Sequence, residues 1–116
     1  MKDYEGTVTY KEKEYKLVFN LNVMEAIQEE YGTIEKWGEL TSGTNGEANA
    51  KAIKFGYTQM LNEALSIEAD EKGTEFKPLT LAFVGRMLTE IGLDTMAKNL
   101  QETVKESTKT DEGKNA

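Results

Sequence analysis

The chain has 116 residues, enough to bury one hydrophobic core, and we expect a single domain over residues 1–106. It contains neither cysteine nor histidine, which excludes disulfides, thiolate zinc sites, cysteine nucleophiles and imidazole as general base or metal ligand. The formal net charge of −7 and the single arginine, Arg86, argue against binding of DNA or RNA, which requires clustered cations.

The first predicted element is a β-hairpin, because apolar residues alternate with polar ones in YEGTVTYKEKEYKLVF. The predicted register gathers the apolar residues on one face, in the pairs Tyr4–Leu21, Gly6–Phe19, Val8–Leu17 and Tyr10–Tyr15. Residues 11–14 are then a polar loop. A slip of one residue would turn the apolar set towards solvent, so the pattern specifies which face is buried.

The apolar spacing then changes from two to three and four residues, which predicts a helix up to Tyr31 with its apolar side formed by Val23, Met24, Ile27 and Tyr31. Asn22 is the predicted N-cap of this helix, and Gly32 its end. A short helix or turn follows in TIEKWGEL, with Thr33 as its predicted N-cap.

Residues 42–50, SGTNGEANA, are rich in glycine, serine, threonine and asparagine and are the predicted internal linker. A long helix is predicted over about residues 47–68, with apolar positions Ile53, Tyr57, Met60, Leu61, Ala64 and Ile67. Gly56 weakens this helix by about 1 kcal/mol relative to alanine. A close helix crossing would explain that glycine.

Residues 69–78 are polar, end in the only proline and are expected to interrupt the helices. Thr80 then caps a helix that ends at Gly92, with an apolar stripe of Leu81, Val84, Leu88 and Ile91 and additional apolar residues Ala82, Phe83 and Met87. Asp94 caps a last helix, in which Met96, Ala97, Leu100 and Val104 are expected to face inward. Residues 107–116 are polar and predicted to be disordered. The sequence therefore predicts a mainly α-helical α+β fold, in which an N-terminal β-hairpin precedes four to five helices.

Motifs for catalysis or cofactor binding are lacking, since the sequence has no GxGxxG, GxxxxGK[ST], HExxH or CxxC. The acidic residues around Gly73 do not have the alternating ligands and closing glutamate of a calcium loop. We therefore expect no catalytic residue, no cofactor and no metal site, and we expect that the protein is not an enzyme.

Four large apolar residues are candidates for binding a partner, because tryptophan and methionine are enriched in binding surfaces: Trp37, Phe83, Met87 and Met96. The alternative is ordinary core packing, since a domain of this size needs most of its large side chains inside.

The order of elements in TVTYKEKEYKLVFNLNVMEAIQEEYGTIEKWGEL, followed by a glycine-rich linker and a helix leading into LTLAFVGRMLTEIG, resembles the tail assembly chaperones of long-tailed bacteriophages and prophages. The resemblance spans roughly Thr7 to Val104 and assigns no binding residue. It implies an α-helical protein with a small N-terminal hairpin, located in the bacterial host cytoplasm. It also implies binding to the tape measure protein, which is kept soluble, and help in recruiting tail tube subunits.

Further expectations concern partners and location. We expect the tape measure protein and the tail tube protein as partners, together with self-association through the edge strand at residues 7–10. The start of the chain lacks the features of a secretory signal, and no apolar stretch is long enough to span a bilayer, so we expect a cytoplasmic protein without membrane or nucleic-acid partners. Two alternatives stay open, namely a small structural tail or connector component and a regulatory adaptor that binds a host protein.

Overall fold

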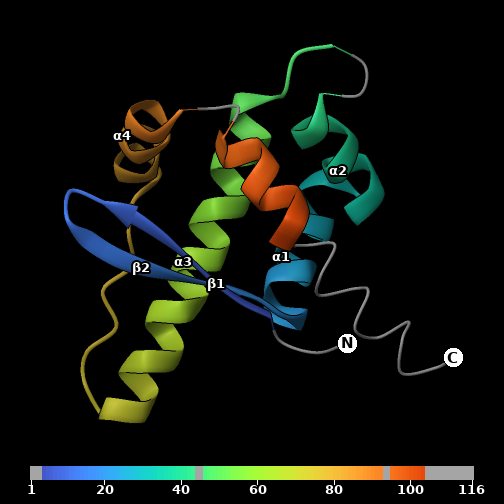
Figure 1. Ribbon diagram of the computed structural model, residues 1–116. Coiled ribbons are helices and arrows are strands. Elements are labelled where there is room, and N and C mark those ends of the chain that lie inside the picture. The colour runs from blue at the N-terminus through green and yellow to red at the C-terminus, as the bar shows by residue number, and fades with distance from the viewer. Residues whose placement is uncertain (1–3, 44–45, 93–94, 104–116) are drawn as a thin grey trace, which may run out of the picture.

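The computed structural model describes residues 4–43, 46–92 and 95–103. A two-stranded antiparallel sheet, β1 (Tyr4–Tyr10) and β2 (Lys13–Phe19), comes first. Four helices follow: α1 (Leu21–Tyr31), α2 (Ile34–Ser42), α3 (Ala50–Lys72) and α4 (Leu81–Ile91). Residues 95–103 are also helical. The predicted mainly α-helical α+β fold, with its N-terminal hairpin and four to five helices, is confirmed (Figure 1).

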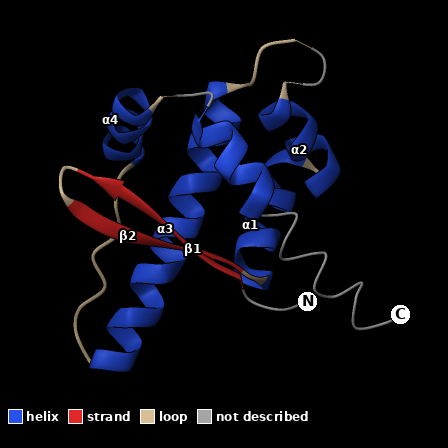
Figure 2. Cartoon of the chain, viewed as in Figure 1, coloured by secondary structure: helices blue, strands red, loops and turns tan. Residues whose placement is uncertain are grey.

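Helix α3 is the centre of the arrangement. It contacts β2, α1, α2 and α4, and the hairpin crosses it (Figure 2). The predicted apolar positions of α3 are buried, except that Ile67 is half-buried: Ile53, Tyr57, Met60, Leu61 and Ala64. One hydrophobic cluster joins the hairpin to all these helices and to residues 95–103. Packing against several elements therefore stabilises the buried part of α3.

The hairpin register differs from the predicted one by two residues. Val8 lies opposite Tyr15 and Tyr10 opposite Lys13, so the turn is only Lys11–Glu12. Both turn residues have positive φ, 51° and 65°, as a tight turn that matches the strand twist requires. Because side chains alternate with a period of two, this shift leaves the same residues on the buried face.

Several helix boundaries also differ from the prediction. The N-cap of α1 is Asn20, whose side chain accepts a hydrogen bond from the Val23 amide at 3.3 Å, and Asn22 lies inside the helix. Leu21, predicted as a strand residue, is the first residue of α1. Helix α3 begins after its N-cap Asn49 and continues to Lys72, four residues beyond the predicted end. Asn20 and Asn22 can each cap a helix, so the sequence alone does not decide which of them begins α1. The polar residues after position 68 can extend a helix as well as form a loop, so the end of α3 is equally open.

Other boundaries agree with the prediction. Thr33 and Thr80 are N-caps, and Gly32 and Gly92 end α1 and α4. The predicted cap at Asp94, the inward position of Val104 and the disordered tail at 107–116 lie outside the described residues.

Candidate partner-binding surface

Three of the four predicted partner-binding residues are in the core. Trp37, Met87 and Met96 have no exposed area. The Trp37 indole donates a hydrogen bond to the Ala52 carbonyl at 3.0 Å, which satisfies its polar atom inside the protein. A small domain gains most from placing its largest side chains inside. The structure therefore corrects the predicted placement of these three side chains, and the surface described below is not built from them.

Phe83 is half-buried and covers the end of the hairpin. Its ring meets the Tyr10 ring edge-to-face, with centroids 5.6 Å apart and planes at 89°, and the Tyr15 ring at 6.2 Å. Edge-to-face pairs of this kind stabilise a fold by roughly 0.5–1.5 kcal/mol beyond the buried area. The contacts of Phe83 thus join α4 to the hairpin.

In the described part of the chain, three other large apolar side chains are exposed. Leu21 is 67% exposed, Leu81 51% and Phe76 42%. Phe76 lies in the segment predicted only as a polar break, and Leu81 was assigned to the buried stripe of α4. A phenylalanine two residues before Pro78, inside an otherwise polar segment, was a signal that sequence reasoning missed. We call residues 76–81 the docking segment.

Asn62 of α3 holds the docking segment in place. Its side-chain oxygen accepts a hydrogen bond from the Leu79 amide at 2.7 Å, and its side-chain nitrogen donates one to the Leu79 carbonyl at 3.1 Å. Leu79 packs against the core, and the Thr80 hydroxyl accepts from the Phe83 amide at 3.1 Å to start α4. The backbone between Phe76 and Leu81 is thereby attached to α3 at Leu79, and both of these side chains are about half exposed.

A shallow groove of about 310 Å³ runs beside this segment. Phe76 and Pro78 form one side, and residues of α3 and the start of α1 form the other. The groove ends at a polar cluster in which Asn20 and Asn22 both donate to Oε2 of Glu63, at 2.8 and 3.0 Å. This arrangement can receive an apolar side chain of a partner and places a carboxylate near it.

A second groove, of about 670 Å³, lies between α3 and α4. Its lining includes Ala82, Gly85 and three cations, Lys51, Lys54 and Arg86, but no acidic residue. We call it the basic groove. Within the described ranges, no ion pair involves any of these three cations. The charged side chains that line this groove are all positive, in a chain of net charge −7.

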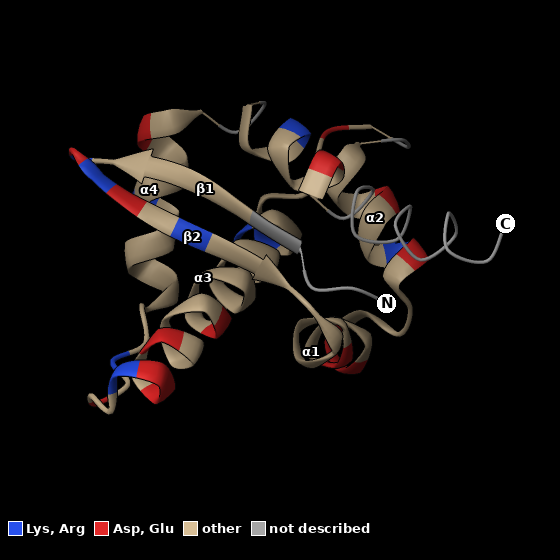
Figure 3. Cartoon of the chain, turned by 60° about the horizontal axis from the view of Figure 1, so that its bottom comes forward, with Lys and Arg blue, Asp and Glu red and all other residues tan. Residues whose placement is uncertain are grey.

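Acidic residues are found on α1 and the lower part of α3, as Figure 3 shows, and exposed Glu90 lies one turn from Arg86 on α4. On α1, Glu25, Glu29 and Glu30 are all exposed. At the end of α3, Glu68 pairs with Lys72 at 3.0 Å, and its hydrogen bond with Lys72 lowers the pKa of the Glu68 carboxyl. Acidic and basic side chains are thus interspersed on the hairpin, on α2 and at the end of α3.

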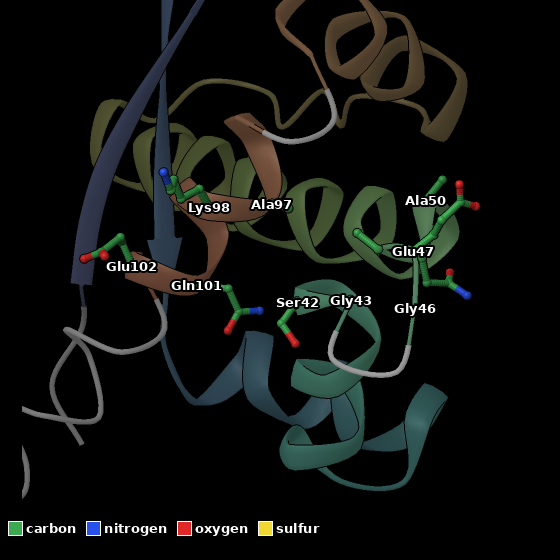
Figure 4. A pocket seen from close by; sticks show the side chains of 11 residues that line it. Ser42, Gly43, Gly46, Glu47, Ala50, Ala97, Lys98, Gln101 and Glu102 are labelled. Atoms are coloured by element: carbon green, nitrogen blue, oxygen red, sulfur yellow. The ribbon is translucent and has the colours of Figure 1, made fainter.

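A third hollow, of about 840 Å³, lies between residues 42–43 and 46–50 on one side and the helical segment 95–103 on the other (Figure 4). Its lining combines glycine and alanine with Glu47, Lys98 and Glu102, so no single charge or donor type converges there. Gln101 bridges to α2 instead, donating to the Thr41 hydroxyl at 2.6 Å. This hollow does not define the chemistry of a ligand.

Among the residues that the structure describes, no group of three or more carboxylates could hold a metal ion. None of the helices in the described ranges is long and apolar enough to cross a membrane. The strongest pKa shift there belongs to Tyr57, where burial raises the pKa of a hydroxyl that donates to the Met96 carbonyl at 2.6 Å. This tyrosine is part of the core, away from both grooves.

No protein-family model, no curated protein and no solved structure matches this chain. The functional argument therefore rests on the residues and surfaces described above.

Proposed function

We propose that this chain is a phage tail assembly chaperone, which binds the tape measure protein in the host cytoplasm, keeps it soluble and helps recruit tail tube subunits. The observation that carries the proposal is the hairpin followed by helices, since this is the architecture that the sequence resemblance implied. Fold alone does not determine function, so the proposal also needs a surface suited to the task.

The docking segment supplies such a surface in this proposal. Phe76 and Leu81 expose apolar area on a segment that two hydrogen bonds from Asn62 attach to α3 at Leu79. A preorganised surface loses less conformational entropy on binding than a mobile one, which favours contact with an extended or helical partner. Apolar side chains of the tape measure protein would cover Phe76 and Leu81, with the shallow groove receiving one of them.

The charge distribution is compatible with a solubilising role. Acidic side chains on α1 and α3 would face solvent around a bound partner, and a net charge well away from zero opposes aggregation. Binding would thus cover exposed apolar surface of the tape measure protein, and the complex would present charged side chains of the chaperone to solvent.

The proposal is tested by co-expressing the chain with the tape measure protein encoded beside it and measuring the soluble fraction of that protein. Wild-type chain should raise this fraction, and the double variant Phe76→Ser/Leu81→Ser should not. A matched variant, Glu35→Ser/Glu39→Ser on exposed positions of α2, should behave like wild type. An unchanged soluble fraction in the presence of wild-type chain would contradict the proposal. So would stoichiometric amounts of the chain in purified virions, which would favour a structural tail component.

A further inference from the structure

The shallow groove beside the docking segment combines an apolar wall with one charged side chain. Phe76 and Pro78 form the wall, and Glu63 of α3 is the charged residue among the described residues that line the groove. The volume of about 310 Å³ lies at the lower end of the range of roughly 300–1,000 Å³ that ligand pockets occupy. The groove therefore has room for one long side chain but not for a helix.

The two carboxylate oxygens of Glu63 differ in what they bind. Oε2 accepts hydrogen bonds from the side-chain amides of Asn20 and Asn22, at 2.8 and 3.0 Å, whereas Oε1 accepts none from the residues that the structure describes. Within those residues, no lysine or arginine forms an ion pair with Glu63. This half-buried carboxylate is thus oriented by two amides and lacks a counter-charge.

The cation of the docking segment does not supply that charge. Lys77 lies between Phe76 and Pro78 in the sequence, but its side chain is exposed and does not line the groove. A counter-charge for Glu63 at the groove would therefore come from another molecule.

A lysine side chain matches both parts of the groove. Its four-carbon stem can pack along Phe76 and Pro78, as the stems of long cationic side chains do on apolar surfaces, while its ammonium group reaches Oε1 of Glu63. An ammonium group is a compact charge, whereas the fork of an arginine is matched to both oxygens of a carboxylate. Each carboxylate oxygen accepts about two hydrogen bonds, so Asn20 and Asn22 already occupy Oε2. The single free oxygen suits lysine better than arginine.

We infer that the shallow groove binds a lysine side chain of the tape measure protein, with the ammonium group on Oε1 of Glu63 and the stem against Phe76 and Pro78. The inference rests on the proposed function and refines it, since the side chain that enters the groove has a charged end as well as an apolar stem. The bound segment of the tape measure protein should then carry this lysine next to the apolar residues that cover Phe76 and Leu81.

The test is zero-length crosslinking of the complex that is purified after co-expression of the full chain with the tape measure protein. A carbodiimide joins a carboxylate to a lysine amine in contact with it, and mass spectrometry identifies the two residues. Glu63 should be linked to one lysine of the tape measure protein. Glu71, an exposed residue of the same helix that does not line the groove, should not be linked to that lysine.

The dissociation rate of the same complex gives a second readout. Glu63→Gln keeps an oxygen for the two asparagine amides and removes the charge, so this variant should fold like wild type, as circular dichroism can verify. It should lose the link and raise the dissociation rate about three- to tenfold. Glu71→Gln, with the same change in net charge, should dissociate at the wild-type rate. Replacing the linked lysine of the tape measure protein by arginine should also speed dissociation.

The outcomes separate this inference from the proposed function. A complex in which Glu63 carries no link, or in which Glu63→Gln dissociates at the wild-type rate, would overturn the inference and leave the proposed function intact. Wild-type dissociation after exchange of the linked lysine for arginine would overturn the selectivity for lysine. If the wild-type chain formed no complex with the tape measure protein, the proposed function would fail, and the inference with it.

Discussion

The indole ring of Trp37 lies directly against Gly56, so that α2 and α3 meet where α3 has no side chain. An added Cβ at Gly56 would overlap Cζ2 of the ring and lie 3.2 Å from Cε2. The indole nitrogen also donates to the Ala52 carbonyl one turn earlier on α3. The glycine that weakens α3 locally is thus the position at which the largest core side chain fits, as the predicted close crossing requires.

The Gly56→Ala variant should be destabilised by about 1–3 kcal/mol, because overpacking against Trp37 exceeds the gain in helix propensity of about 1 kcal/mol. Gly38→Ala is the matched control, since α2 has free space around the Cβ that would be added there. Its free energy of unfolding should be unchanged or up to about 1 kcal/mol higher. Urea unfolding of both variants measures the difference, and equal effects at the two glycines would contradict this packing.

Tyr57 joins α3 to the last helical segment. Its hydroxyl donates to the Met96 carbonyl at 2.6 Å inside the core. Tyr57→Phe removes this hydrogen bond and should lower the free energy of unfolding by about 1 kcal/mol. A loss well below 1 kcal/mol in urea unfolding would show that the bond contributes little.

Tyr57 also makes the free energy of unfolding depend on pH. Burial raises the pKa of Tyr57 above the ordinary value of 10.0, so the hydroxyl loses its proton at lower pH in the unfolded chain than in the folded one. Its stabilising contribution should be complete below pH 10 and should decline as pH rises further, by up to about 1.4 kcal/mol per pH unit. The stability difference between wild type and Tyr57→Phe should therefore shrink above pH 10, whereas a constant difference would contradict the assignment.

Removal of the Tyr31 hydroxyl should have the opposite effect on stability from removal of the Tyr57 hydroxyl. Its hydroxyl oxygen is buried and has no hydrogen-bond partner among the residues that the structure describes, while its ring meets the Phe55 ring edge-to-face at 5.7 Å. Tyr31→Phe keeps the ring contact and removes the unpaired polar atom, so stability should be unchanged or should rise by about 1 kcal/mol. Thermal unfolding of Tyr31→Phe and of Tyr57→Phe makes the comparison. Similar destabilisation of the two variants would refute the prediction.

The turn Lys11–Glu12 has two residues other than glycine at positive φ. Asn-Gly is favoured at such a turn, so the double variant Lys11→Asn/Glu12→Gly should raise the free energy of unfolding by about 1 kcal/mol. Lys11→Ala keeps the strained backbone and removes the charge near the Tyr10 ring, and it should be neutral or slightly destabilising. If the longer loop of the predicted register were present, the Asn-Gly variant would give no gain in stability.

The sequence was sufficient to locate helices that begin at a capping side chain or end at a glycine. Thr33 and Thr80 begin helices because their hydroxyls accept amide hydrogen bonds, and Gly32 follows the last residue of α1 with φ at 92°. The hairpin register could not be obtained in this way, because two registers that differ by two residues bury the same side chains. Turn geometry decides between them, and Lys-Glu gives no sequence signal for a tight turn.

The candidate surface was harder to predict than the fold. Periodicity indicates which side of a helix is apolar, but it does not indicate how many layers cover that side. Val84 and Leu88 of the predicted stripe are therefore buried, whereas Leu81, in the same stripe, is half exposed. The segment that carries Phe76 is attached to α3 by hydrogen bonds between Asn62 and Leu79, residues separated by 17 positions, and no local pattern encodes that contact.

Photo-crosslinking from the docking segment tests the central claim most directly. A photoreactive phenylalanine analogue in place of Phe76 or Leu81 should form a covalent adduct with co-expressed tape measure protein. The same analogue in place of Glu35, an exposed residue of α2, should not. Adducts confined to positions 76 and 81 are the result we predict. Equal yields at all three positions, or no adduct from the docking segment, would contradict the claim that this surface binds the tape measure protein.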